Sequence, residues 1–271
     1  MKELNIITII QARTESTRLP NKVLLPILDS PLLSKMIERV NHSKLKGTIV
    51  VATSTNSEDD KIEDLCLKQR INYFRGHTTD LLDRHYKAAK KHKAHTVVKI
   101  PSDCPLIDPI IIDKVIQYYL DNLGKFDYVS NLHPASYPDG NDVEVISFKV
   151  LETAWKEADK DFEREHTTPF IWERPDRFRI GNVEWESGLD YSTTHRWTID
   201  YEEDYQFIKR VFEEFYPKNK NFKLNDIINL LHEKPEIYHI NSKYAGKYWY
   251  ENHLNELNHI IEYKRKILDK K

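Results

Sequence analysis

The chain has 271 residues, 39% of them hydrophobic, and its 41 basic and 43 acidic side chains give a formal net charge of −2. This balance argues against a protein that coats nucleic-acid phosphates, because such proteins carry a basic excess. The hydrophobic content argues against a disordered polymer. Two cysteines, Cys66 and Cys104, are too few for a disulfide scaffold and favour a reducing compartment.

No apolar run approaches the roughly 18 residues that a membrane-spanning helix needs. The N-terminus leads directly into Leu4–Ile10, a β-rich run that is too short for the core of a signal peptide. We therefore expect a cytoplasmic protein that binds neither nucleic acid nor a membrane.

The first half of the chain alternates β-rich runs with amphipathic segments, in which apolar residues such as Leu32, Met36 and Val40 recur at helical spacing. The predicted strands are Leu4–Ile10, Thr48–Thr53, Asn72–Arg75 and Thr96–Ile100, and the predicted helices are Pro31–Asn41, Ser57–Gln69 with Ser57 as its N-cap, Asp80–Lys93 and Pro109–Asn122. This alternation predicts an α/β, Rossmann-like fold: a mostly parallel sheet with helices on both faces.

From Asp127 onward the predicted elements change in order and spacing. The strands are Tyr128–Asn131, Val143–Ser147, Phe178–Val183 and His195–Ile199, and the helices are Lys149–Asp159, Glu163–Glu173, Glu202–Tyr216 and Tyr244–Leu268. We predict a catalytic nucleotide-binding domain over residues 1–217, with a small mixed-sheet insertion at about 127–195, and a helical C-terminal extension over residues 218–271.

Ligands of doubly wound sheets bind where the carboxyl ends of the strands open a crevice. The loops that follow the predicted strands are therefore the expected site, namely Gln11–Lys22, Ser54–Ser57, Gly76–Thr79 and Pro101–Asp108.

The loop after the first strand carries three cations, Arg13, Arg18 and Lys22. Guanidinium and ammonium groups suit a triphosphate, because one offers a planar fork of donors and the other a mobile point charge. No glycine lies in the loop, which excludes both the P-loop and the dinucleotide-binding fingerprint. The alternative is an ordinary solvated loop with scattered charge.

Two acids follow other predicted strands. Asp103 stands where Mg²⁺ could bridge substrate phosphates, since that ion prefers oxygen ligands. The alternative is a turn or helix cap, which suits Asp108 better, and capping preference alone favours Asp200 as the N-cap of the next helix. Together with Arg13 and Lys22, however, Asp103 and Asp200 supply the cations and metal ligands that nucleotidyl transfer needs.

The sequence resembles the cytidylyltransferases that activate acidic sugars, the CMP-KDO and CMP-sialic acid synthetase group, and in particular their spore-coat-polysaccharide branch. Matching blocks occur in the family's order over about residues 4–215, and ordered blocks are more specific than any single motif. They are Ile10–Arg13, Arg18–Leu24, Phe74–Gly76, Asp80–Arg84, Ser102–Ile107, Pro138–Val145, Arg164–Pro169 and Trp197–Asp200.

The resemblance implies the fold of nucleotide-diphospho-sugar transferases, and transfer of CMP from CTP to a nonulosonic or ulosonic acid with release of pyrophosphate, in surface polysaccharide or glycoconjugate biosynthesis. It also implies Mg²⁺ as cofactor and a homodimer. Carried over by position, the catalytic residues are Arg13, Arg18 and Lys22, and the metal ligands are Asp103 and Asp200. The nucleotide-binding residues are Gln11, Ala12, Arg13, Lys22, Thr53, Gly76, Asp80, Arg84 and Ser102, and the sugar-binding residues are Asn141, Glu144, Glu165 and His166.

Three features leave alternatives. Glu15 departs from the small residues common in the family, and its charge requires that it point outward or pair with a cation such as Arg18. His166 is either an acceptor contact or a histidine with a structural hydrogen bond. The aromatic cluster of the tail either forms a dimer surface or docks on its own domain; it comprises Tyr244, Tyr248, Trp249 and Tyr250.

Other functions also suit the fold. The acceptor could be a phosphorylated polyol or small acid, and the protein could be a GT-A-like glycosyltransferase or a catalytically silent nucleotide-binding module. Asp139–Asn141 and Asp80–Leu82 are not the D-x-D pair typical of such glycosyltransferases, which weighs against that alternative.

Overall fold

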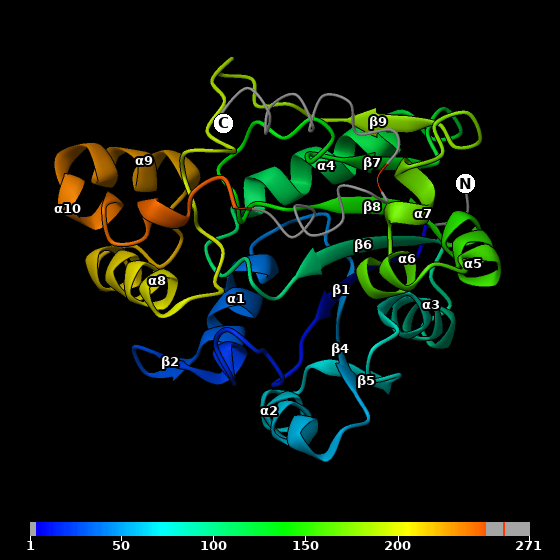
Figure 1. Cartoon of the computed structure of the whole chain (residues 1–271), viewed down its shortest axis with the longest axis horizontal. Coiled ribbons are helices and arrows are strands. Elements are labelled where there is room, and N and C mark those ends of the chain that lie inside the picture. The colour runs from blue at the N-terminus through cyan, green and yellow to red at the C-terminus, as the bar shows by residue number, and fades with distance from the viewer. Residues whose placement is uncertain (1–3, 248–256, 258–271) are drawn as a thin grey trace.

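A seven-stranded sheet forms the middle layer of the protein (Figure 1), in a computed structural model that describes residues 4–247 and residue 257. Its order is β5-β4-β1-β6-β8-β7-β9, and only β8 runs antiparallel to its neighbours. The strands are β1 (Ile6–Gln11), β4 (Thr48–Ser54), β5 (Asn72–Gly76), β6 (Thr96–Pro101), β7 (Tyr128–Ser130), β8 (Glu144–Ser147) and β9 (Ile180–Asn182). The predicted mostly parallel sheet is confirmed.

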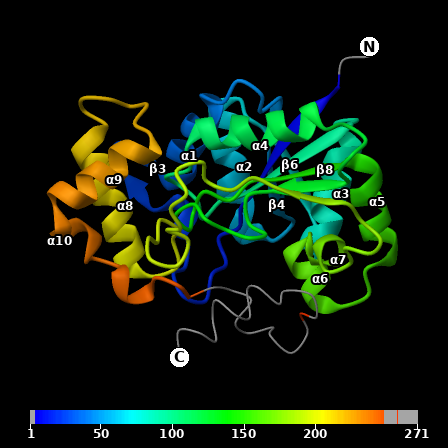
Figure 2. The ribbon, with the colours of Figure 1, turned by 90° about the horizontal axis from the view of Figure 1, so that it is seen from above.

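Helices cover both faces of this sheet (Figure 2), because alternate strand residues point to opposite sides. In β1, Ile10 packs with one group of helices and Ile9 with the other. The first group is α1 (Leu32–Asn41), α2 (Asp60–Gln69), α4 (Pro109–Asp121), α8 (Glu202–Phe215), α9 (Leu224–Glu233) and α10 (Pro235–Tyr238); the second is α3 (Leu81–Lys91), α5 (Phe148–Glu157), α6 (Asp161–His166) and α7 (Pro169–Trp172).

The order of the parallel strands places a topological switch point between β1 and β6. These two strands are neighbours, with Gln11 in register with Pro101. From β1 the chain proceeds through β4 to β5 at one edge of the sheet, and it then returns to β6 on the other side of β1. The loops that leave β1 and β6 consequently emerge side by side, and Ser102 N donates to Gln11 O at 3.3 Å. A ligand site is expected at this point of the sheet.

The structure corrects three sequence predictions of local structure. The predicted helix Glu163–Glu173 is divided into α6 and α7, because Thr167 adopts a φ of 74° and Pro169 begins a new helix. Ser57 is not a cap; the side chain of Asn56 accepts from Glu58 N, and a 3₁₀ turn, η2 (Ser57–Asp59), precedes α2.

The third correction concerns His195–Ile199, which is not a strand. Its backbone pairs with loops instead: Trp197 N donates to Asp139 O at 2.7 Å and Ile199 N donates to Asp103 O at 3.0 Å. Apart from an isolated bridge between Asp139 and Arg196, the segment takes no part in a ladder. It carries Arg196 and Thr198 to the carboxyl end of the sheet.

The insertion and the extension both pack on the central unit. The strands β7, β8 and β9 lengthen the same sheet, while a separate two-stranded ribbon is formed by β2 (Pro26–Ile27) and β3 (Ser30–Pro31). The helices α9 and α10 share one hydrophobic core with α1 and α8. In the described part of the extension, α10 is followed by the 3₁₀ turn η3 (Ser242–Tyr244).

The predicted tail helix Tyr244–Leu268 and the aromatic residues Tyr248, Trp249 and Tyr250 lie outside the described residues, except for Tyr244–Lys247 and Leu257. Within the described ranges, no helix has the length and apolar character to span a bilayer.

Candidate active site

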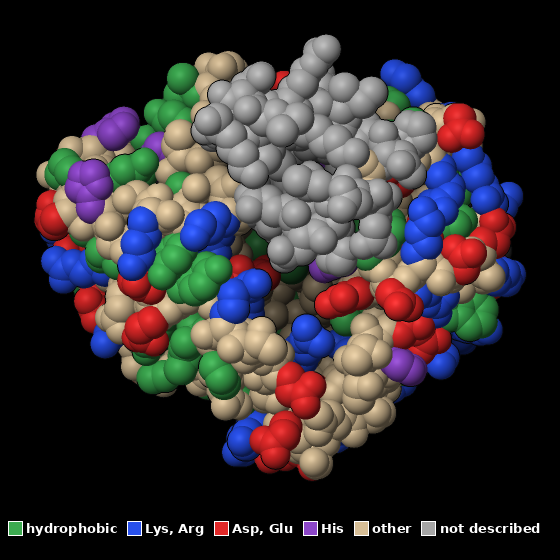
Figure 3. All heavy atoms as spheres, viewed as in Figure 1, with side chains coloured by type: hydrophobic (Ala, Val, Ile, Leu, Met, Phe, Trp, Pro, Cys, Tyr) green, Lys and Arg blue, Asp and Glu red, His purple; other side chains and the backbone are tan. Residues whose placement is uncertain are grey.

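A cavity of about 920 Å³ opens at the carboxyl ends of β1 and β6. Figure 3 shows basic and acidic side chains around a hollow near the middle of one face. Most of the residues predicted for the site line this cavity: Gln11, Ala12, Arg13, Arg18, Lys22, Arg84, Ser102, Asp103, Asn141, Glu144, Glu165, His166 and Asp200. The structure thus gathers loops that are far apart in sequence around one hollow.

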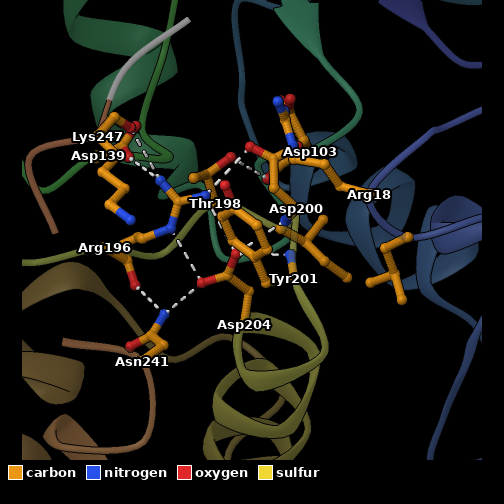
Figure 4. A network of polar contacts seen from close by, with 12 residues as sticks. Arg18, Asp103, Asp139, Arg196, Thr198, Asp200, Tyr201, Asp204, Asn241 and Lys247 are labelled. Atoms are coloured by element: carbon orange, nitrogen blue, oxygen red, sulfur yellow. Dashed lines mark hydrogen bonds and ion pairs between the residues drawn. The ribbon is translucent and has the colours of Figure 1, made fainter. Parts of the chain in front are cut away.

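Lys22 lies between the two predicted metal ligands. Its Nζ donates to Asp200 Oδ1 at 2.9 Å and lies 3.8 Å from Asp103 Oδ2. Arg18 Nη2 reaches the same Asp200 Oδ1 at 2.7 Å (Figure 4). Burial alone would raise the pKa of Asp200, but the charges and hydrogen bonds of Lys22 and Arg18 hold that pKa below its ordinary value. The two acids therefore meet the cations of the first loop in one place.

A buried carboxylate shapes the loop after β1. Asp59 accepts hydrogen bonds from Thr14 N at 2.7 Å and Thr14 Oγ1 at 2.8 Å, and from Ser54 N at 3.2 Å and Ser54 Oγ at 2.5 Å. These donors outweigh the effect of burial and lower the pKa of Asp59. The loop that carries Arg13 is thus fixed by a side chain, in the absence of glycine. No motif around Asp59 indicates this role.

The roles of Arg196 and Asp204 were also missed, whereas their partner Asp200 was predicted. The Arg196 side chain is 2% exposed and forms ion pairs with Asp139, Asp200 and Asp204 (Figure 4). These charges and hydrogen bonds raise the pKa of Arg196, against the opposing effect of burial. Both Asp139 and Arg196 line the cavity. A signal existed for Asp139, which lies within the matching block Pro138–Val145.

Two carboxyl groups that line the cavity, Asp139 and Asp142, have pKa values above the ordinary range of an aspartate. Burial, followed by the charge of Asp103, raises the pKa of Asp142 to about 7. Burial and the neighbouring Asp142 raise the pKa of Asp139 well above its ordinary value. This part of the wall is therefore less negative than its composition suggests.

A buried ion pair closes the inner end of the cavity. Lys99 on β6 pairs with Glu144 on β8, and Tyr128 Oη donates to Glu144 Oε2 at 2.7 Å. These contacts outweigh the effect of burial and hold the pKa of Glu144 below its ordinary value. Lys99 is a further residue that sequence analysis did not single out, although a lysine inside a buried β-rich run is itself a signal.

Three residues predicted to bind the nucleotide do not line the cavity. Thr53 is buried within β4, and Gly76 ends β5 where an added Cβ would lie 2.7 Å from the Phe74 ring. Asp80 instead caps α3, accepting from Asp83 N at 2.8 Å, and pairs with Arg164 at 2.5 Å.

The structure also distinguishes between the alternatives for caps and for Glu15. Asp108 caps α4 by accepting from Ile110 N at 2.8 Å, as expected. Asp200 is not a cap: Asp204 accepts from the backbone of Asp200 and Tyr201, so the Asp200 carboxylate is available to the cavity. Glu15 is exposed and accepts from Asn56 Nδ2 at 2.7 Å, away from Arg18.

The donor set fits a magnesium ion that a substrate phosphate completes. Asp103 and Asp200 both lie within ion-pairing distance of one ammonium nitrogen, so both carboxylates border the same space. Within residues 4–247 and 257, no group of three or more metal-ligating side chains is present. Mg²⁺ is commonly held by one or two carboxylates together with phosphates and water, rather than by a full protein cage.

Comparisons with known proteins identify the family. A sequence model of the family described as "Cytidylyltransferase" matches residues 7–254. An uncharacterised protein of Methanocaldococcus jannaschii is 39% identical over 248 residues, covering 92% of this chain and 99% of that protein. The spore coat polysaccharide biosynthesis protein SpsF of Bacillus subtilis is 32% identical over 237 residues, covering 86% of this chain and 96% of that protein.

A solved structure agrees with these relatives and with the predicted fold. The cytidylyltransferase of Leptospira borgpetersenii superposes with a TM-score of 0.82 and 33% sequence identity, covering 87% of this chain and 97% of that one. The chain therefore belongs to the cytidylyltransferase family and is a CTP-dependent nucleotidyltransferase.

Proposed function

We propose that this enzyme transfers CMP from CTP to a hydroxyl group of an acidic sugar, of the nonulosonic or ulosonic acid class, and releases pyrophosphate. The observation that carries the proposal is the meeting of Arg18, Lys22, Asp103 and Asp200 at the mouth of one large cavity. The similarity to a spore coat polysaccharide protein supports a place in surface polysaccharide or glycoconjugate biosynthesis.

Chain residues supply most of what the reaction needs. The hydroxyl oxygen of the acceptor loses its proton to water and forms a bond to the α-phosphorus of CTP, while the bond to pyrophosphate breaks. This step depends on alignment and charge neutralisation. Arg13, Arg18 and Lys22 neutralise the phosphates, and the backbone around Gln11, Ala12 and Ser102 approaches them from the strand ends. Asp103 and Asp200 would hold Mg²⁺, which when bound draws charge from the phosphates.

The inner cavity wall suits a polyhydroxylated acceptor. Asn141, Glu165 and His166 provide polar groups, while the rings of His133 and Trp172 lie 4.7 Å apart and form an aromatic wall. Sugars bind to this combination because their hydroxyl groups need hydrogen-bond partners and their C–H faces need apolar surface. Lys99 on β6 lines the cavity beside Glu144 on β8, and its ammonium group is a candidate contact for the acceptor carboxylate.

The proposal is tested by measuring pyrophosphate release from CTP with a panel of acceptors: an ulosonic acid, a nonulosonic acid and a polyol phosphate. We expect turnover with a sugar acid.

Asp103→Ala should abolish this turnover with an unchanged melting temperature, whereas Asp64→Ala, at an exposed position on α2, should leave the turnover unchanged. Lys22→Ala should cost about 2–4 kcal/mol of transition-state stabilisation. Turnover only with a polyol phosphate would contradict the proposed acceptor class, and a wild-type rate in Asp103→Ala would remove Asp103 from the metal site.

The homodimer and the cytoplasmic location remain predictions. The one described member of the tail's aromatic cluster, Tyr244, stacks on Tyr201 of its own chain, with ring centroids 4.1 Å apart. Light scattering at micromolar concentration distinguishes a dimer from a monomer.

A further inference from the structure

A buried residue of the C-terminal extension, Asn241, contacts residues that border the catalytic site. This residue lies between α10 and η3 and is 2% exposed. Its Nδ2 donates to Arg196 O and to Asp204 Oδ1, both at 2.9 Å (Figure 4). Asn241 therefore joins the extension to two residues that hold the cavity wall.

Those two residues in turn hold Asp200. Asp204 Oδ2 accepts from Asp200 N at 2.9 Å and from Arg196 Nη2 at 3.1 Å, while Arg196 Nη2 also donates to Asp200 Oδ2 at 3.2 Å. Both the backbone and one carboxylate oxygen of Asp200 are thus fixed from behind. The other oxygen, Oδ1, is the one that meets Lys22 and Arg18.

The extension touches the same arginine a second time. Arg196 Nη1 donates to Lys247 O at 3.2 Å and to Asp139 Oδ2 at 3.4 Å. Two residues after position 217, Asn241 and Lys247, therefore contact Arg196 directly. A buried arginine whose partners are held on both sides has little freedom to turn away.

We propose that Asn241 is a positioning residue for nucleotidyl transfer: by holding Arg196 and Asp204 it makes Asp200 present one carboxylate oxygen to the metal and the triphosphate. The inference rests on the proposed function and gives the C-terminal extension a part in it. Partners that orient a metal ligand commonly affect metal affinity or activity by about 10–100-fold when they are removed.

The test compares Asn241→Leu, which keeps a similar volume but cannot donate, with Asn229→Leu, an exposed position on α9. Mn²⁺ binding in the presence of saturating CTP is followed by electron paramagnetic resonance, and CTP binding without metal is followed by calorimetry. We expect Asn241→Leu to weaken Mn²⁺ binding about 10–100-fold and to change metal-free CTP binding much less. Asn229→Leu should leave both unchanged.

A merely structural role would lower the melting temperature without this selective loss of metal affinity. Equal Mn²⁺ affinity in wild type and a folded Asn241→Leu variant would overturn the inference while leaving the proposed function standing. If the wild-type protein with CTP binds no Mn²⁺, the metal site of the proposed function fails, and the inference fails with it. Should Asn241→Leu not fold, Asn241→Ala, which leaves room for water, is measured in its place and read in the same way.

Discussion

At this site single buried side chains fix the conformation of the loops, a role that glycine-rich backbone has in other phosphate-binding loops. Asp59 gathers four donors from Thr14 and Ser54 and so ties the residue after Arg13 to the end of β4. Arg196 acts in the same way on the opposite side of the cavity. Because each of these charges is buried among partners, removing one partner leaves the others unsatisfied.

Asp59→Asn replaces an acceptor of the phosphate loop with an amide donor. We expect a loss of about 1–3 kcal/mol in the free energy of unfolding, because buried donors of Thr14 or Ser54 lose their acceptor, and weaker binding of CTP. Asp60→Asn is the matched control, since Asp60 is exposed and pairs with Arg75 at the surface. Urea unfolding and CTP calorimetry measure the two effects. Equal behaviour of the two variants would show that Asp59 does not shape the loop.

The buried histidine His85 makes stability depend on pH. It is fully buried, its Nδ1 lies 2.8 Å from Leu81 O, and burial followed by the charge of Lys99 lowers its pKa to about 3. Between pH 6.5 and 3 the unfolded chain binds a proton at this residue that the folded protein does not bind. The contribution of His85 to stability is therefore greatest above pH 6.5 and falls as the pH is lowered.

Between pH 6.5 and pH 4.5, the unfolding free energy of the wild type should fall by about 2 kcal/mol more than that of His85→Leu. The comparison is between pH dependences, so that a uniform packing cost in the variant cancels. Urea unfolding at several pH values provides the measurement. A variant whose stability falls with acid as steeply as that of the wild type would assign the dependence to other groups.

At the scale of elements, the site depends on where helices begin. Asp108 caps α4 through Ile110 N at 2.8 Å and also accepts from Leu224 N, at the start of α9, at 2.7 Å. One carboxylate thus joins the helix that follows β6 to the C-terminal extension. The break between α6 and α7 has a similar effect, because it leaves Glu165 and His166 at the cavity rather than inside a longer helix.

Asp108→Ala should cost about 2–4 kcal/mol in unfolding free energy, since it removes a cap and leaves a second buried donor without its acceptor. Ser147→Ala is the comparison, because Ser147 caps only α5, through Val150 N at 3.2 Å, and should cost about 1 kcal/mol. Chemical unfolding measures both. A smaller loss of unfolding free energy in Asp108→Ala than in Ser147→Ala would contradict the conclusion that Asp108 both caps α4 and holds the start of α9.

At the scale of the whole molecule, the sequence predicted the strands and helices that depend on local patterns of residues. The four parallel strands and their helices were found to within a few residues, because apolar runs and helical spacing are read directly from the chain. The strand predicted at His195–Ile199 was wrong, because its backbone partners are the distant loops at Asp103 and Asp139. Asp200 was weighed as a cap because it stands just before the helix, whereas the side chain that accepts from the backbone at the start of α8 is that of Asp204, inside the helix.

The site was predictable only in part, for the same physical reason. The cations and acids of the matching blocks lie at strand ends, where the fold itself brings them together. Lys99 pairs with Glu144 and Arg196 pairs with Asp139, both far away in sequence, so these ion pairs could not be read from the chain. Arg196 also pairs with Asp200 and Asp204 nearby, but the sequence does not show that its side chain is buried. Three residues of or near the matching blocks were wrongly expected at the cavity. Thr53 is buried within β4, Gly76 packs against the Phe74 ring, and Asp80 caps α3.

The most direct test of the whole account is a crystal structure with CTP and Mn²⁺, in which anomalous scattering locates the metal. We predict one peak in contact with the carboxylates of Asp103 and Asp200 and with a phosphate oxygen, with Lys22 and Arg18 displaced onto the triphosphate. A peak bound elsewhere while CTP occupies the cavity, or CTP bound away from Arg13 and Lys22, would contradict it.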